Sequence, residues 1–583
     1  MAYLTVNDDG VLVISCEYSE KNVVKDIGAR WDTNNQVWLL ACTPEKLEVL
    51  LDKLGQSVID GKVEEKIKQE IEKREKLVKF QALAKSDHPV RFKIPGLKLP
   101  LYNYQKLGAM FAITNADGTL LADEMGLGKS LQGIAVAMYL KSVGLAENCL
   151  VVAPASLKFN WPIEIEKFTD EEYVVIDGSP SNRVAQWLRE DVFFHVGNYE
   201  LVQEDLFGGR KMKEKKDETK EQKERREAIV KKAEARKRIL KPIRERKWDL
   251  LIVDEAHYLK NPTSARSRNI KRLLARIRIA LTGTPLDGRL EELHSIMEFV
   301  KPGLMISRPR FMQRHTVTDF WGRVTKYKRK EEVIKQIAPY FLRRLKRDVL
   351  KDLPDKVYQN RMVLLTPSER RIYNQLAKRG HKVTENTEAM VAVIRCKQFC
   401  DIPSMVDPKV LKASKLEALK EVLEEVVIEN KNKALLFSQY AQVAEHLLAT
   451  LEELKLKYLY LWGETPKKER ASMQAQFNDD DSIQVMVGTE AMSLGLNLQA
   501  ASYVLNYDDN WAPAIMSQRE DRAHRHGQKD TVTVVNFVCV NTVEERIRKV
   551  LYGKSKVTDE MLGDNTEESV LMRLGPQDLA KLL

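Results

Sequence analysis

The chain has 583 residues, of which 43% are hydrophobic and 31% are charged, and its net charge is +11. At roughly 100–200 residues per domain, this length favours about three or four domains. No segment approaches the ~18 apolar residues of a membrane span, and the first residues lack a basic-then-apolar signal, so we expect a soluble, cytoplasmic protein, nuclear if eukaryotic.

The six cysteines indicate a reduced protein rather than a zinc protein. They are scattered, and only Cys396 and Cys400 lie close together, at a spacing that makes them neighbours on a helix. A zinc site needs a second cysteine pair or a histidine cluster nearby, which this sequence lacks. We therefore interpret the cysteines as thiols of the hydrophobic core.

Two segments precede the main body of the chain. Residues 1–58 are typical of a small α/β module, because two strand patterns, 11–15 and 36–41, are followed by an amphipathic helix that begins at Pro44. Residues 59–95 are rich in Lys and Glu, with apolar residues at helical spacing. This pattern predicts a charged helical linker.

After residue 95, short apolar runs that end in small or acidic residues alternate with helical patterns. Such runs are typical of buried parallel strands. They fall into two clusters, which are 149–154, 250–257 and 279–285, and then 433–440, 483–489 and 502–508. We predict an α/β fold with two parallel-sheet lobes, at 96–360 and 361–555, a helical protrusion at 361–425 and a tail at 556–583.

A basic segment is inserted in the first lobe at 208–247. From Arg210 to Lys247 there are 18 Lys or Arg residues against 8 Asp or Glu, so nearly all the net positive charge lies here. A run rich in Lys and Glu is usually a solvated helix, and that is the expected structure. Beside an α/β lobe, such a helix could contact the phosphates of a nucleic acid.

The run LADEMGLGKS, residues 121–130, predicts a nucleotide site. Its glycines let backbone N–H groups point at phosphate oxygens, its lysine adds a positive charge, and its serine hydroxyl can bind Mg²⁺. The strict phosphate-loop pattern has glycine where this chain has Asp123. The expected nucleotide-binding residues are Asp123, Glu124, Met125, Gly126, Leu127, Gly128, Lys129 and Ser130, with Ser130 also expected as a metal ligand.

A pair of carboxylates follows the strand pattern at 250–253. Asp254 can hold Mg²⁺, and Glu255 can orient and deprotonate an attacking water. The sequence Asp-Glu-Ala-His is a weak signal alone, but here it lies after the phosphate loop and before LTGTP, residues 281–285. This order of motifs predicts ATP hydrolysis with Mg²⁺.

The run SQREDRAHRHGQ, residues 517–528, supplies cations for the γ-phosphate. Arg522 and Arg525 are three residues apart, or one helical turn, so both can face one target. We expect these two residues to act as arginine fingers. Arg519 lies off that face and is expected to be structural or to face DNA.

The ordered motifs resemble the Swi/Snf-type branch of superfamily 2 helicase-like ATPases. They are LYNYQ, DEMGLGKS, VVAPASL, DEAHYLKN, LTGTP, FLRRLKRDVLKDLP, LLFSQY, MSLGLNLQAASYVLNYD, NWAP and DRAHRHGQ, within residues 98–553. The resemblance implies two RecA-like lobes with ATP between them, helical insertions on both, and ATP-driven translocation along double-stranded DNA. FLRRLKRDV, residues 341–349, and the DRAHR-x-GQ ending separate this branch from RNA-unwinding DEAH proteins.

The resemblance also implies roles for single residues. Gln105 is expected to recognise adenine, Gln518 to face the nucleotide, and Thr282 and Thr284 to couple the lobes. Contacts with the DNA backbone would position the protein without reading sequence. They are expected from Pro154, Ser156, Ser438, Gln439, Thr489 and Ser493.

Two positions depart from the family pattern. The family usually has Asp-Trp-Asn-Pro where this chain has Asn-Trp-Ala-Pro at 510–513, and isoleucine where this chain has His526. Trp511 is expected to keep its packing and coupling role, while the contribution of residue 512 is open.

The N-terminal module is similar to the HARP domain of annealing helicases. The similarity rests on Gly-Ala-Arg-Trp-Asp at 28–32 and on Trp38. Arg30 could grip a phosphate, and Trp31 could stack on an unpaired base at a fork. Alternatively, both tryptophans are the core of a small domain with little else to bury.

These expectations describe an ATP-dependent translocase on double-stranded or branched DNA, acting on forks, branches or annealing intermediates, with ATP and Mg²⁺ as cofactors. A strand-separating helicase, an ATP-gated DNA clamp and a chromatin remodeller are the alternatives, although intact catalytic residues argue against an inactive clamp. We expect a monomer without membrane contact, of prokaryotic or viral origin. The preferred DNA structure, the direction of movement and the protein partners stay open.

Overall fold

The computed structural model describes residues 2–7, 10–33, 35–54, 57–86, 88–115, 118–155, 157–207, 244–283, 289–318, 324–350, 352–381, 386–410, 412–493, 496–525 and 527–553. Contacts divide the chain into two compact units. The first is Met1–Glu124 with Gly128–Val349, and the second is Met125–Leu127 with Leu350–Leu583. Most of the predicted basic segment and the tail at 556–583 lie outside the described residues, so those predictions stay predictions.

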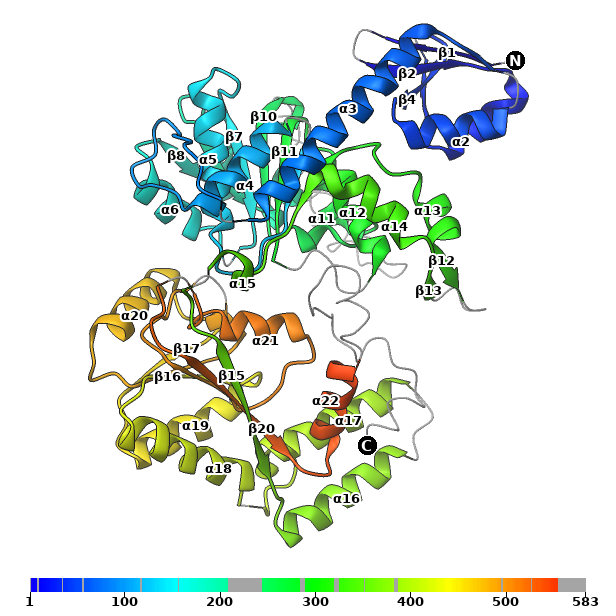
Figure 1. Ribbon diagram of the computed structural model, residues 1–583. Coiled ribbons are helices and arrows are strands. Elements are labelled where there is room, and N and C mark those ends of the chain that lie inside the picture. Colours follow the sequence, from blue (N-terminus) through cyan, green and yellow to red (C-terminus); the bar gives the residue numbers. More distant parts are fainter. Residues whose placement is uncertain are drawn as a thin grey trace, which may run out of the picture. The chain divides into compact units, whose positions relative to one another are not determined.

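The first unit begins with a five-stranded sheet in the order β3-β4-β2-β1-β5 (Figure 1). Its strands are β1 (Ala2–Val6), β2 (Val11–Ser15), β3 (Arg30–Asp32), β4 (Val37–Ala41) and β5 (Ser57–Ile59), with helices α1 (Lys21–Asp26) and α2 (Pro44–Leu54). Leu4 of β1, Leu12 and Ile14 of β2 and Leu40 of β4 are buried and share a core with Leu50 of α2. The module therefore has its own core, as predicted, but it has five strands where the sequence indicated two, because β3 and β5 are too short to show alternation.

Helix α3 (Gly61–Ala84) occupies most of the predicted charged linker. Asp60 caps it by accepting a hydrogen bond from the backbone N–H of Lys62. Farther along, Glu70 accepts a hydrogen bond from the Tyr340 hydroxyl at 3.2 Å, and the buried Gln81 donates to the carbonyl of Phe341. The helix is thus packed against the body of the first unit, so it is not a free spacer.

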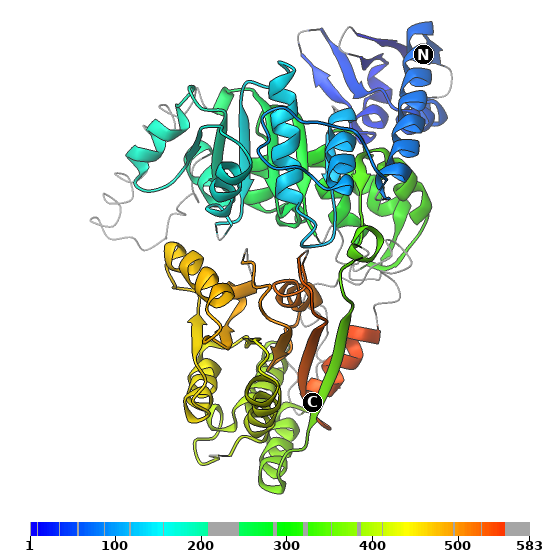
Figure 2. The same ribbon diagram turned by 60° about the vertical axis from the view of Figure 1, so that its left-hand side comes forward.

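A seven-stranded sheet forms the body of the first unit, in the order β14-β6-β11-β10-β7-β9-β8, and its paired strands are parallel (Figures 1 and 2). The strands are β6 (Thr119–Leu121), β7 (Cys149–Ala153), β8 (Tyr173–Val175), β9 (Phe194–Asn198), β10 (Trp248–Asp254), β11 (Ala275–Leu281) and β14 (Phe341–Leu342). The longer strands are largely buried, and the runs 149–153 in β7 and 250–253 in β10 are apolar throughout, as the sequence predicted for parallel strands.

The helices of this body are α4 (Asn103–Thr114), α5 (Lys129–Ser142), α6 (Asn160–Phe168), α7 (Pro180–Trp187), α8 (Tyr199–Leu201), α11 (Ala265–Lys271), α12 (Leu290–Val300), α13 (Arg308–His315), α14 (Lys330–Ile337) and α15 (Lys346–Val349). A two-stranded antiparallel hairpin, β12 (Thr316–Thr318) and β13 (Val324–Tyr327), follows α13. Helix α5 packs on β10 and β11, and α12 packs on β6 and β11.

The second unit has a six-stranded parallel sheet in the order β15-β20-β19-β16-β18-β17. Its elements are β15 (Lys356–Val363), α16 (Pro367–His381), α17 (Asn386–Asp401), α18 (Ser414–Leu423), β16 (Ala434–Phe437), α19 (Ala441–Glu453), β17 (Tyr458–Leu461), α20 (Lys467–Asp479), β18 (Val485–Gly488), β19 (Tyr503–Asn506), α21 (Pro513–Glu520), β20 (Val532–Cys539) and α22 (Val543–Gly553). The unit begins at Leu350, so the predicted boundary at 360 was placed too late. The predicted boundary falls inside β15. The residues of this strand are mostly exposed, so the sequence shows no apolar run there.

The cysteines are free thiols, and all but Cys16 are buried. Cys396 and Cys400 lie on α17, and burial raises the pKa of Cys396 to about 12. A thiol with such a pKa stays protonated, as expected for a core residue. Within the described part of the chain, no helix combines the length and apolar character needed to cross a bilayer.

Candidate active site

The phosphate loop connects β6 to α5 and depends on two glycines. Gly126 and Gly128 have φ angles of 86° and 72°, a left-handed region that other residues rarely adopt. A Cβ at Gly128 would also lie 2.5 Å from Nε2 of Gln105, so a larger residue does not fit. Helix α5 then starts at Lys129, which places Lys129 and Ser130 in its first turn. The loop has the conformation that phosphate binding at a helix N-terminus requires.

Gln105 lies against this loop, and its expected recognition of adenine stays a prediction. Its side-chain oxygen accepts a hydrogen bond from the Tyr102 backbone N–H at 3.1 Å, which closes the capping box of α4. Only 4% of the residue is exposed. Helix α4 therefore fixes the amide beside Gly128.

Lys129 folds over the loop. Its Nζ donates to the carbonyl oxygens of Asp123 and Glu124, at 2.8 and 3.3 Å. The ammonium group therefore lies beside the loop backbone, and its role at a phosphate stays a prediction.

The Asp123 carboxylate is not a nucleotide ligand, contrary to the expectation. It is fully buried and forms an ion pair with Arg344, with Nε of Arg344 at 3.0 Å, and it accepts a further hydrogen bond from Gln132. Glu124 is used in a similar way, because its carboxylate accepts a hydrogen bond from the Lys346 backbone N–H at 2.7 Å. Both side chains brace the loop against the FLRRLK segment.

Asp254 and Glu255 lie at the carboxyl end of β10, as predicted. The Asp254 carboxylate accepts hydrogen bonds of 2.9 Å from Trp161 Nε1 and from the Glu255 backbone N–H. The pKa of Asp254 is raised to about 6, chiefly by burial and also by the charge of Glu255, while the hydrogen bond from Trp161 and the charge of Lys129 act in the opposite direction. Asp254 and the strand that leads into the phosphate loop end at the same edge of the sheet, because Leu281 of β11 pairs with both Asp254 and Leu121.

Glu255 has a strained backbone, with a φ angle of 49°. Its Oε2 lies 3.1 Å from Nδ1 of His257, and the same nitrogen lies 3.5 Å from the Thr282 hydroxyl. The DEAH sequence and the LTGTP motif thus meet at His257. Thr284 lies outside the described residues.

The candidate metal ligands are chemically suitable for Mg²⁺. Ser130 offers a hydroxyl oxygen and Asp254 a carboxylate oxygen, and Mg²⁺ prefers such hard oxygen ligands together with water and phosphate oxygens.

In the second unit, the run 517–528 is helical only at its start. Helix α21 ends at Glu520, so Arg522 and Arg525 lie in the turns that follow, and the argument from one helical face was wrong. Each guanidinium is held by a backbone carbonyl four residues earlier. Arg522 Nε donates to Gln518 at 3.0 Å, and Arg525 Nε donates to Asp521 at 2.7 Å. The two side chains are oriented by these bonds rather than by a helix.

Arg519 is structural in this fold. It is fully buried, donates to the Asp508 carbonyl at 2.8 Å and lies 3.6 Å from the Asp508 carboxylate. These contacts confirm the structural role that the sequence allowed and leave no surface for DNA.

Two of the expected DNA contacts are buried instead. Pro154 is buried at the end of β7, where its carbonyl accepts hydrogen bonds from the following turn. The Ser438 hydroxyl is 2% exposed and donates to Asp508 at 2.6 Å. Both residues shape their loops, and neither presents its side chain to a ligand.

Gln439 and Thr489 are partly exposed at the carboxyl ends of β16 and β18. The side-chain oxygen of Gln439 accepts a 2.8 Å hydrogen bond from Lys397 of α17, and the same ammonium group lies 5.3 Å from the ring of Trp511. Trp511 is 8% exposed, in agreement with its expected packing role. Ser156 and the side chain of Ser493 lie outside the described part of the chain.

In the N-terminal module, Arg30 and Trp31 lie on the edge strand β3 and are exposed. Trp31 is 49% exposed and packs edge-on against Trp38, with ring centroids 5.2 Å apart. Burial raises the pKa of the Glu298 carboxyl of α12. The charges of Lys46, Lys271 and Arg30 act in the opposite direction. Trp38 therefore packs on the core of the module, whereas half of Trp31 remains exposed.

Several residues of the site were missed by sequence reasoning. Trp161 and Tyr199 are both buried against the DEAH strand end, and Tyr199 donates its hydroxyl proton to the carbonyl of Asp254 at 2.7 Å. A tyrosine or tryptophan in an apolar pattern looks like ordinary core. Arg344 did carry a signal, because an arginine pair between apolar residues, as in Leu-Arg-Arg-Leu at 342–345, needs buried partners.

Two family models match the chain. The SNF2-related domain matches residues 37–433, and the helicase conserved C-terminal domain matches residues 414–527.

Individual proteins are similar over most of this chain. It is 29% identical over 496 residues to an "Uncharacterized ATP-dependent helicase" of Mycoplasma pneumoniae, covering 81% of this chain and 44% of the relative. It is also 29% identical over 508 residues to the "Putative ATP-dependent helicase/translocase YwqA" of Bacillus subtilis, covering 84% and 51%. The chain therefore spans about half the length of these relatives. A solved structure, "Sulfolobus solfataricus SWI2/SNF2 ATPase core in complex with dsDNA", is 27% identical, with 84% of this chain and 98% of that chain covered and a TM-score of 0.39.

Proposed function

Since the chain belongs to the family of SNF2-related domains, we propose that it is an ATP-dependent translocase on double-stranded DNA. The observation that carries the proposal is the register of the sheet: Leu281 of β11 pairs with Leu121, which leads into the phosphate loop, and with Asp254 at the end of β10, so the loop and the two carboxylates follow strands that end at one edge of the sheet. This is the set of groups that phosphoryl transfer to water needs. The name of the Bacillus subtilis relative, a putative helicase/translocase, supports the same class.

Each residue has a defined task in this proposal. Lys129 and the backbone of 126–130 bind the phosphates, Gln105 and Gln518 face the nucleotide, and Glu255 orients the attacking water and accepts its proton. Ser130 and Asp254 would hold Mg²⁺, which neutralises phosphate charge when bound. Arg522 and Arg525 place positive charge on the γ-phosphate in the transition state.

DNA is contacted through its phosphates. Gln439, Thr489, Ser493 and Ser156 remain the proposed contacts, together with the basic segment at 208–247. Such contacts position the protein without reading sequence, so binding should weaken steeply as salt rises.

The N-terminal module adds a second DNA contact, directed at forks or branches. The exposed Trp31 and the neighbouring Arg30 support this role, since an aromatic face next to a cation suits an unpaired base and its phosphate. Strand annealing, fork remodelling or repair would follow from this preference.

ATPase rates with duplex DNA, forked DNA, single-stranded DNA and RNA test the proposal. Duplex or forked DNA should stimulate the rate most, and displacement of a third strand from a duplex should show movement. Stimulation by RNA alone would favour an RNA helicase. Unwinding of a plain duplex would favour a strand-separating helicase, and DNA-stimulated hydrolysis without displacement would favour a clamp.

A further inference from the structure

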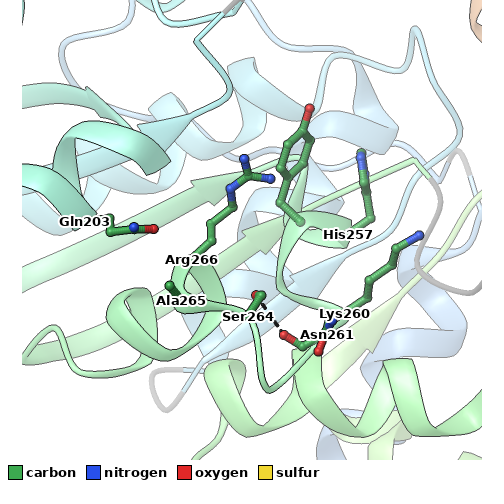
Figure 3. A pocket seen from close by; sticks show the side chains of 8 residues that line it. Gln203, His257, Lys260, Asn261, Ser264, Ala265 and Arg266 are labelled. Carbon is green, nitrogen blue, oxygen red and sulfur yellow. Dashed lines mark hydrogen bonds between the residues drawn. The ribbon is translucent and has the colours of Figure 1, made fainter. Parts of the chain in front are cut away.

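A pocket of about 480 Å³ lies beside the DEAH sequence in the first unit (Figure 3). Its size is that of a ligand pocket. Most of the residues that line it carry polar or charged groups, among them Gln203, His257, Tyr258, Asn261, Ser264 and Arg266. The Tyr258 ring contacts two of the cationic or titratable side chains of the lining, since the Arg266 guanidinium lies 4.7 Å from its centroid and the His257 ring centroid lies 4.9 Å from it.

The segment that builds the pocket is basic. Residues 256–286 contain seven Lys or Arg and no Asp or Glu, a local excess that the larger one at 208–247 obscured. Lys260 and Arg266 line the pocket, and Arg268 and Arg272 are exposed on or just after α11. The positive charge therefore continues from the pocket onto the neighbouring surface, which suits a ligand with repeated negative charges.

Contacts with Tyr258 and Glu200 orient the Arg266 guanidinium, and a bound anion could replace one of them. Its guanidinium lies 4.7 Å from the ring centroid of Tyr258 and 2.7 Å from the Glu200 carboxylate. Half of the Glu200 side chain is exposed, and an ion pair in such a position is weak. A phosphate can therefore take the place of Glu200 and bind the guanidinium fork with two hydrogen bonds.

The pocket is connected to the catalytic carboxylates. Tyr258 stacks on Tyr199, with ring centroids 5.2 Å apart and an angle of 19° between the planes. The Tyr199 hydroxyl donates to the carbonyl of Asp254 at 2.7 Å and is 3.3 Å from that of Glu255. His257, on the pocket wall, lies 3.1 Å from the Glu255 carboxylate. A ligand that moves the Tyr258 ring or His257 acts directly on the strained Glu255.

We infer that this pocket binds a backbone phosphate of DNA, and that its occupancy is passed to Glu255 through Tyr258, Tyr199 and His257. The inference rests on the proposed function and adds to it a route by which DNA stimulates ATP hydrolysis. Arg266 is the main phosphate ligand in this arrangement, and Tyr199 is a positioning residue that does not touch DNA.

The test compares Arg266→Ala with Arg268→Ala. Both arginines are on α11 and both changes remove one charge, but only Arg266 lines the pocket. Arg266→Ala should raise the duplex concentration for half-maximal ATPase stimulation about 10-fold or more, and should reduce the salt dependence of DNA binding by about one phosphate contact. Arg266→Lys, which keeps the charge, should recover part of the affinity. Arg268→Ala removes a charge outside the pocket and should change both measurements much less than Arg266→Ala does.

Tyr199→Phe tests the connection separately. It keeps the ring stack and removes only the hydroxyl, so it should lower the maximal DNA-stimulated rate while the DNA dissociation constant stays unchanged. If Arg266→Ala matches Arg268→Ala in half-maximal DNA concentration and in salt dependence, the pocket does not bind DNA. If Arg266→Ala instead abolishes binding of an acidic peptide such as polyglutamate and leaves DNA binding intact, the site belongs to a protein partner and the inference is wrong. If no DNA stimulates the wild-type protein, the proposed function itself has failed.

Discussion

Arg344 and Asp123, 221 residues apart in the chain, form an ion pair in which neither side chain is exposed. The pair joins the phosphate loop to the segment that follows β14. Arg343 extends the same brace, because its Nη1 lies 3.2 Å from the carbonyl of Ala122 and 3.3 Å from that of Gly283. Two neighbouring arginines therefore hold the phosphate loop and the LTGTP motif in one position.

Replacing Arg344 by methionine should destabilise the first unit strongly. The change leaves the Asp123 carboxylate buried without its cation, which typically costs about 3–5 kcal/mol. Thermal unfolding should show a lower midpoint, with ATP affinity reduced because the loop loses its support. Arg347→Ala is the control, since its side chain is 74% exposed, and its midpoint should not change. Equal midpoints for the two variants would mean that the buried pair does not support the loop.

The strands could be predicted from the sequence, but the partners of their polar ends could not. Runs such as 250–253 are apolar throughout, and their burial follows from that pattern alone. Asp123 looked like a nucleotide ligand because of its place in the loop, while its true partner lies in another part of the chain. The turns after Glu520 were also missed, since an Arg- and His-rich run does not show where a helix ends.

The phosphate loop gives the most direct test of the catalytic assignment. Lys129→Ala should remove ATPase activity and leave the fold and DNA binding largely intact, because Lys129 is partly exposed and donates hydrogen bonds to carbonyls of the loop. Glu255→Gln should bind ATP and hydrolyse it slowly, since the amide cannot accept a proton from water. Nucleotide retention and steady-state rates distinguish the two. Near-normal hydrolysis in both would show that the site is elsewhere.

Substitutions of the three arginines near the end of α21, Arg519, Arg522 and Arg525, should have different effects on hydrolysis and stability. Arg522→Ala and Arg525→Ala should slow hydrolysis much more than they weaken nucleotide binding, because fingers act on charge in the transition state. Arg519→Ala should instead lower the stability of the second unit, because it removes the buried partner of Asp508. Single-turnover rates and unfolding midpoints measured on all three variants give the comparison. A stable Arg519→Ala protein with the largest loss of hydrolysis would reverse these roles.

The stability of the first unit should fall as the pH falls from about 6.5 to about 4. Burial lowers the pKa of His294 from 6.5 to about 4, and its Nε2 lies 2.8 Å from the carbonyl of Ile306. Below pH 6.5 the unfolded chain takes up a proton that folded His294 does not, so the stability contributed by the neutral ring is lost progressively. The loss approaches about 3 kcal/mol near pH 4.

His294→Gln should make this pH dependence shallower, since the amide can still contact Ile306 but does not titrate. Unfolding midpoints between pH 4 and 7 measure the effect. The exposed His88 provides the control, and His88→Gln should give the wild-type profile. A wild-type profile for His294→Gln as well would assign the acid sensitivity to other groups.

Deleting residues 1–60 should leave duplex-stimulated ATPase activity mostly intact and reduce the preference for forked DNA. The catalytic motifs begin only near Tyr102, and α3 keeps its own contacts with the first unit through Glu70 and Gln81. The module can therefore be removed without removing a catalytic residue. What it adds is a second DNA contact held at short range, which raises affinity for branched DNA through effective concentration.

Trp31→Ala should reproduce part of this loss, because half of Trp31 is exposed for stacking. Fork and duplex dissociation constants, measured for the full chain, the deletion and Trp31→Ala, decide the matter: an unchanged fork-to-duplex ratio in the deletion would limit the module to a structural role.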